Sequence, residues 1–95
     1  MMTTQVRHLP EQSRYELALD GGTAYATYHR QGDIAVIDHT VTPPELRGQG
    51  IAGRLVKGML ADMRAQGLKV VPACSFVAVY FRRHPEERDL LARPE

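Results

Sequence analysis

The sequence has little that would define a function by composition alone. Among its 95 residues Cys74 is the one cysteine, so no disulfide forms within a single chain, and a lone thiol is more typical of a reducing compartment than of a secreted scaffold. Twelve lysines and arginines against eleven aspartates and glutamates leave a formal charge of +1. This balance argues against nucleic acid or an anionic membrane as the obligatory partner.

Long apolar runs are also missing, because no segment approaches the ~20 apolar residues of a membrane span. The sequence contains no internal repeat, low-complexity tract or linker. We therefore expect residues 1–95 to form a single soluble, cytoplasmic domain without a membrane contact. Such a small chain is expected to be a monomer or a weak homodimer.

The first half of the chain predicts antiparallel strands joined by tight turns, because apolar and polar residues alternate there. Residues 15–19 and 23–29 flank Asp-Gly-Gly, which supplies the positive-φ positions of a hairpin. Residues 34–41 form the next strand. This strand is apolar on both faces up to Asp38, which predicts a central strand covered on its two sides.

The second half alternates helices and a strand. Apolar residues at helical spacing follow Gly50 and predict a long helix, and Gly67 suits the C-terminus of that helix. Residues 68–71 predict a short buried strand that lies parallel to residues 34–41. A second helix follows it, and a short C-terminal helix from Pro85 completes the chain. The order predicts an α/β fold with a mixed, mostly antiparallel sheet of about five strands. The helical stripe comprises Ala52, Leu55, Val56, Met59 and Met63.

The most informative segment is the glycine-rich turn at residues 43–53, between the strand and the long helix. Glycines let the backbone approach a ligand, and the free N–H groups and positive dipole end of the helix favour an anion. Arg47 adds a positive charge. The turn therefore predicts a phosphate site, and its alternative is a tight turn with a surface arginine.

Residues 48–53 also match G-x-G-x-x-G, the dinucleotide fingerprint. That fingerprint expects an acidic residue about 20 positions further on, where this chain has Pro72, Ala73 and Cys74. Antiparallel hairpins before the turn also disagree with a dinucleotide fold. The context therefore disfavours this interpretation.

Residues 47–52, Arg-Gly-Gln-Gly-Ile-Ala, resemble the R-x-x-G-x-A pyrophosphate loop of the GNAT N-acetyltransferase superfamily. Residues 38–40, 43–50, 68–74, 80–81 and 83–85 together resemble its small single-domain subfamily, over nearly the whole chain. The resemblance implies a minimal GNAT fold and acetyl-coenzyme A as co-substrate. It also implies coenzyme A contacts from Val41, Thr42, Arg47, Gly48, Gln49, Gly50, Ile51 and Ala52, with a main-chain N–H near Val41 and Thr42 polarising the thioester carbonyl.

Cys74 is expected at or near a helix N-terminus, where the pKa of a thiol falls. Spacing alone leaves open whether it is a reactive thiol or a small apolar filler. The resemblance implies the former, because the subfamily has a cysteine facing the coenzyme at this place.

His39 is expected to share a strand face with Ala35, Ile37 and Val41, and Asp38 to point to the opposite face. A histidine on an apolar face is more often a core residue than a catalyst, but the resemblance implies a general base on this strand. Two mechanisms stay open. In one, His39 deprotonates an amine that attacks the thioester directly; in the other, His39 activates Cys74, which carries the acetyl group.

Tyr80 could return a proton to the leaving thiolate, although its apolar neighbours favour packing. The histidines and Cys74 lack metal-ligand spacing, so no metal is expected.

The acceptor is expected to be an amine on a small molecule, peptide or protein. Two alternatives remain: a coenzyme A-binding module without catalysis, and a small nucleic-acid binder using its basic C-terminus, with steeply salt-dependent affinity.

Overall fold

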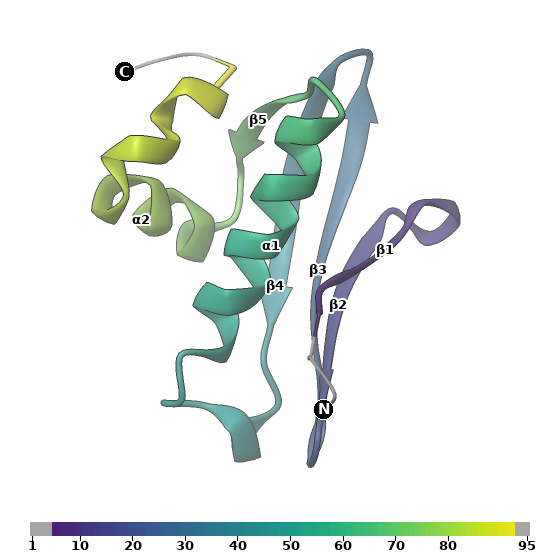
Figure 1. Cartoon of the computed structure of the whole chain (residues 1–95), viewed down its shortest axis with the longest axis vertical. Helices are drawn as coiled ribbons and strands as arrows, with labels where there is room; N and C mark the ends of the chain where they lie inside the picture. The colour runs from purple at the N-terminus through teal and green to yellow at the C-terminus, as the bar shows by residue number, and fades with distance from the viewer. Residues whose placement is uncertain (1–4, 93–95) are drawn as a thin grey trace.

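The computed structural model describes residues 5–92 as a five-stranded sheet with two helices, α1 and α2, packed against it (Figure 1). The sheet order follows the chain, β1-β2-β3-β4-β5. All neighbouring strands are antiparallel except β4 and β5, which are parallel. The strands are β1 (Arg7–Leu9), β2 (Arg14–Leu19), β3 (Gly22–Gln31), β4 (Ile34–Val41) and β5 (Lys69–Pro72).

Helix α1 (Ile51–Ala65) connects the two parallel strands, and α2 (Ser75–Arg83) follows β5. Three short 3-10 helices complete the order: η1 (Pro10–Gln12), η2 (Pro44–Leu46) and η3 (Pro85–Leu90). The predicted α/β fold with a mixed sheet is therefore confirmed. The short strand β1 was not predicted, and the expected C-terminal helix is the 3-10 helix η3.

The core lies between the sheet and the helices. The predicted apolar stripe of α1 provides much of it, since Leu55, Val56, Met59 and Met63 are each 0% exposed. Tyr15 and Leu17 of β2 face this stripe from the sheet and are 1% exposed. Burying such side chains contributes roughly 1.5 to 3 kcal/mol each, so this layer holds α1 to the sheet.

Among residues 5–92, strand β4 is covered on one face only, which corrects the prediction that both of its faces are covered. Ala35 and Ile37 are 0% exposed on the helix side, whereas Ile34 and Val36 on the other face are only half-buried. Among residues 5–92, the rear of the sheet is therefore partly exposed.

No described helix of residues 5–92 is long and apolar enough to cross a membrane.

Candidate active site

A cleft of about 460 Å³ opens where β4 ends and α1 begins. The structure brings most of the predicted coenzyme-binding residues together in its wall. Gln49 is the exception, because it contributes to a neighbouring hollow and its Nε2 donates to the carbonyl of Glu45 at 3.3 Å. The residues lining the cleft are Thr40, Val41, Thr42, Leu46, Arg47, Gly48, Gly50, Ile51, Ala52, Gly53 and Phe76.

The turn at the floor of the cleft leaves a row of backbone donors free. Gly48 and Gly50 have φ values of 81° and 72°, a left-handed conformation that glycine adopts without strain. Arg54 is the first residue of α1 whose amide donates to a backbone carbonyl, that of Gly50 at 3.1 Å. Within residues 5–92, the amides of residues 48–53 have no backbone acceptor. Such a row at a helix N-terminus suits an anion.

Gly53 closes the predicted glycine-rich turn, but the sequence did not single it out as a coenzyme contact. It lies within α1, where glycine costs roughly 0.5 to 1 kcal/mol relative to alanine, and a Cβ built on it meets no protein atom within 4 Å. Gly58, one turn and a half further along, differs, because a Cβ there would lie 2.5 Å from the Val6 side chain. Packing explains Gly58, whereas Gly53 lines the cleft and has open space beside it.

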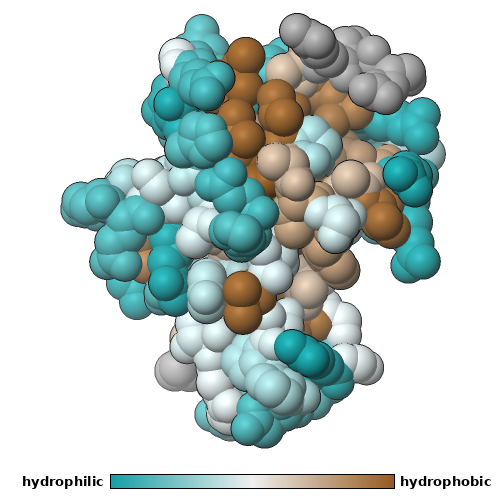
Figure 2. Space-filling model, turned by 180° about the vertical axis from the view of Figure 1, so that it is seen from behind, coloured by the Kyte–Doolittle hydropathy of each residue, from teal (hydrophilic) through white to brown (hydrophobic). Residues whose placement is uncertain are grey.

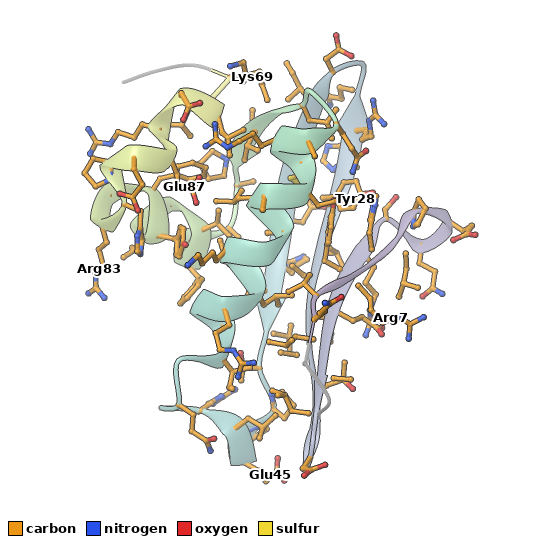
Figure 3. The ribbon with its side chains drawn as sticks, viewed as in Figure 1. Arg7, Tyr28, Glu45, Lys69, Arg83 and Glu87 are labelled. Carbon is orange, nitrogen blue, oxygen red and sulfur yellow. The ribbon has the colours of Figure 1, made fainter. Side chains whose placement is uncertain are left out.

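Arg47 and Glu45 flank the turn and are exposed, and Figure 3 labels Glu45. The Nε of Arg47 donates to the carbonyl of Thr42 at 3.3 Å, which holds the guanidinium beside the end of β4. This cation adds to the positive end of the α1 dipole.

Strand β4 separates from β5 beside the cleft. Their pairing ends with Ile37 opposite Pro72, and the last link between the two segments is the amide of Cys74, which donates to the Ile37 carbonyl at 3.0 Å. Beyond that point the β5-facing edge of Thr40 to Thr42 has no strand beside it in the described part of the chain, residues 5–92. The predicted place for a thioester is therefore an open backbone edge.

Cys74 is the N-cap residue of α2 and is half-buried. Its thiol donates to the Oγ1 of Thr40 at 3.5 Å. Burial raises the pKa of the thiol, but the Thr40 hydroxyl and the backbone amides of Val77, Phe76 and Thr40 outweigh burial and lower it overall. When the thiol loses its proton, the Thr40 hydroxyl is free to turn and donate to the sulfur. Thr40, which sequence analysis did not single out, therefore links the cleft to the thiol.

A β-bulge in β4 overturns the expected position of His39. Thr27 of β3 pairs with His39 and Tyr28 pairs with Ile37, so Asp38 is the extra residue. A bulge shifts the alternation of side chains along its strand. The face of each residue can be assigned from its partner, because paired residues share a face.

The buried partner of Thr40 is Ala26, which places Thr40 on the helix side with Cys74. His39 pairs with Thr27 and is exposed on the opposite face. The expectation that His39 shares a face with Ala35 and Ile37 is therefore wrong. Asp38 lies on the same rear face, where its Oδ2 is 3.3 Å from the Nδ1 of His29.

Tyr80 lies against His84 rather than in the cleft. The two rings stack with centroids 4.1 Å apart, and Tyr80 is 8% exposed. Burial, with the carboxylates of Glu87 and Glu86, raises the pKa of its hydroxyl. Its surroundings are those of a packing residue. Among residues 5–92 no group of three or more His, Cys, Asp or Glu side chains is arranged to hold a metal ion.

The fold and the cleft together define an α/β protein with a glycine-rich turn suited to an anion at the junction of a parallel strand pair. Residues 14–90 match the family model of the GCN5-related N-acetyltransferases, and the chain belongs to this family. No curated protein matches the chain.

A solved structure has the same fold. It is the solution structure of a GCN5-like protein from Staphylococcus aureus, proposed to be an N-acetyltransferase, and it aligns with a TM-score of 0.75 at 23% identity. The alignment covers 100% of this chain and 94% of that one. The five-stranded sheet is therefore that of a minimal GNAT domain.

Proposed function

We propose that this acetyltransferase moves an acetyl group from acetyl-coenzyme A to an amine on a small molecule, peptide or protein, and that Cys74 carries the group in transit. The observation that supports this most is the extent of the cleft. One end holds the free amides of residues 48–53, and the other reaches Thr40, whose hydroxyl contacts the Cys74 thiol. A coenzyme held by its phosphates at the first end would direct its thioester toward the second.

The residues of the turn fit the pyrophosphate of coenzyme A. The amides of residues 48–53 supply hydrogen bonds, the α1 dipole and Arg47 supply positive charge, and the space beside Gly53 admits the group. Further along, the open edge at Val41 and Thr42 offers a main-chain N–H to the thioester carbonyl. A preorganised donor of this kind is worth roughly 3 kcal/mol of barrier where water is excluded.

The geometry favours Cys74 over His39 as the first group to react. The lowered pKa of the thiol increases its thiolate fraction at neutral pH. The thiolate would attack the carbonyl carbon, form the acetyl-thioester of Cys74 and release coenzyme A as its thiolate, which takes up a proton. Attack by an amine would then form the amide, return Cys74 to the thiolate and release one proton to solvent or a base.

Direct transfer with His39 as base is the alternative mechanism, and it stays a prediction. Because His39 lies on the face away from Cys74, it would act on an amine that arrives from the rear of the sheet. A coenzyme A-binding module without catalysis is the second candidate function.

Intact-protein mass spectrometry after mixing with acetyl-coenzyme A tests the covalent route. We expect an adduct of one acetyl group that is absent from Cys74→Ala and present in His39→Gln. Loss of transfer activity in Cys74→Ala is expected together with unchanged coenzyme A binding. Full turnover in Cys74→Ala would exclude the covalent route. Coenzyme A binding with neither an adduct nor turnover, across a panel of amines, would support the non-catalytic module.

A further inference from the structure

A second pocket lies on the other side of α2, away from the coenzyme cleft. Its volume is about 560 Å³, within the range of small-molecule sites. Helix α2 contributes to both hollows: Phe76 lines the cleft, and the wall of the second pocket contains Ala78, Phe81 and Arg82. Because each residue turns a helix by about 100°, these three residues lie on the side of α2 opposite Phe76. The two hollows therefore use different faces of the same helix.

The wall of this pocket is apolar except for two guanidinium groups. Val71 from β5, Ala78 and Phe81 from α2 and Leu91 after η3 supply the apolar surface, and Arg82 and Arg88 border it from two elements. Figure 2 shows an apolar surface on the rear of the molecule, bordered by hydrophilic atoms. The pocket thus combines apolar walls with positive charge.

The carboxylates of the same region are engaged elsewhere. Glu87 accepts from Arg64 of α1 at 2.9 Å, and Asp89 accepts from the same guanidinium at 3.1 Å. Glu86 contacts the ring nitrogen of His84 at 3.0 Å. Figure 3 shows Glu87 on the inner side of η3, toward α1. Segment η3 therefore turns its acids away from the pocket.

Arg82 and Arg88 have no carboxylate within ion-pair distance among residues 5–92. Both arginines are exposed, and a guanidinium binds a carboxylate through two parallel hydrogen bonds. The apolar wall would cover a hydrocarbon body attached to that carboxylate. We propose that this pocket binds a small apolar monocarboxylic acid, independently of the coenzyme.

Titration of the full chain with hexanoate, followed by backbone amide NMR, tests the proposal. We expect saturable shifts near residues 71, 78, 82, 88 and 91. Hexanamide, which keeps the shape without the charge, and acetate, which keeps the charge without the body, should each bind at least about tenfold more weakly, a difference of about 1.4 kcal/mol. Equal binding of hexanoate and hexanamide, or no binding of hexanoate, would overturn the proposal.

Matched arginine variants locate the site. Arg82→Gln and Arg88→Gln should each weaken hexanoate binding at least about tenfold. Arg83→Gln should leave it unchanged, since the Arg83 side chain extends away from the molecule (Figure 3). Saturating coenzyme A should not displace hexanoate. Displacement, or an equal loss in Arg83→Gln, would contradict a separate pocket, and melting curves of the three variants control for folding.

Discussion

The two ends of α1 are built in opposite ways. At the N-terminal end, the amides of residues 48–53 lack backbone acceptors and two positive-φ glycines shape an open turn. At the C-terminal end, Asp62 accepts from Tyr15 at 2.6 Å and lies 3.4 Å from the Nδ1 of His8. Gln66 also donates to Asp62. One end leaves donors for a ligand, whereas the other end satisfies its polar groups within the protein.

The two ends of α1 therefore differ in which property of the protein a substitution there should change. Gly53 and Asp62 are about 14 Å apart along the axis at 1.5 Å per residue, so substitutions at the two ends should act independently. We expect changes at the first end to alter coenzyme binding and changes at the second to alter the free energy of unfolding.

The largest effect is expected for Gly53→Asp. A carboxylate in the space beside the free amides would repel the pyrophosphate and should weaken coenzyme A binding at least about 100-fold, or about 2.7 kcal/mol. The same carboxylate lies in the first turn of α1, where it stabilises a helix by roughly 0.3 to 1 kcal/mol. Calorimetric titration should therefore show lost affinity while the melting temperature is unchanged or raised. Retained affinity would contradict the assignment of the cleft.

Asp62→Ala is the matched change at the other end. It removes the acceptor of the Tyr15 hydroxyl, which belongs to a side chain only 1% exposed. Leaving such a group unpaired costs roughly 1 to 3 kcal/mol. Denaturant unfolding should show this loss, with the coenzyme A dissociation constant unchanged for the folded protein. A change in affinity without a change in stability would invalidate the contrast.

Two alanine substitutions compare the glycines inside α1. Gly58→Ala should destabilise the fold by about 1 kcal/mol net, because the new methyl group meets Val6 and this overlap exceeds the gain in helix propensity. Gly53→Ala should instead stabilise the fold by roughly 0.5 to 1 kcal/mol and weaken coenzyme A binding. Melting curves and titrations of both variants check the pair. Similar behaviour of the two would show that the room beside Gly53 has no role in binding.

The smallest effect concerns the thiol. A group with a lowered pKa ionises at lower pH, so alkylation of Cys74 by iodoacetamide should reach half its maximal rate below the pH of about 8.5 typical of a free thiol. Thr40→Val removes a donor to the thiolate and should move this midpoint upward. The pH profile of alkylation in both proteins measures the shift. A midpoint unchanged by Thr40→Val would rule out Thr40 as the partner of the sulfur.

Much of this architecture could be predicted from the sequence. The alternation in residues 15–41 and the stripe of α1 indicated the sheet and its long helix, because burial imposes those periods directly. The glycine turn with Arg47 indicated the anion site for a similar reason, since its conformation is local. The cleft accordingly contains most of the residues expected there.

The parts that failed depend on pairing between distant segments. Asp38 forms a bulge only because β3 pairs with β4 in this register, and no local pattern marks it. The bulge exchanged the faces of His39 and Thr40, so Thr40 rather than His39 meets Cys74. Gly53 was predicted as part of the glycine-rich turn but not as a coenzyme contact, because its significance lies in the empty space beside it.

The central claim is that the turn preceding α1 holds the phosphates of coenzyme A. Backbone amide NMR of the isotope-labelled chain, titrated with coenzyme A, tests this claim most directly. We expect the largest saturable shifts at the amides of residues 48–53 and small shifts at residues 62–66. Saturable binding that leaves the amides of residues 48–53 unshifted would contradict it.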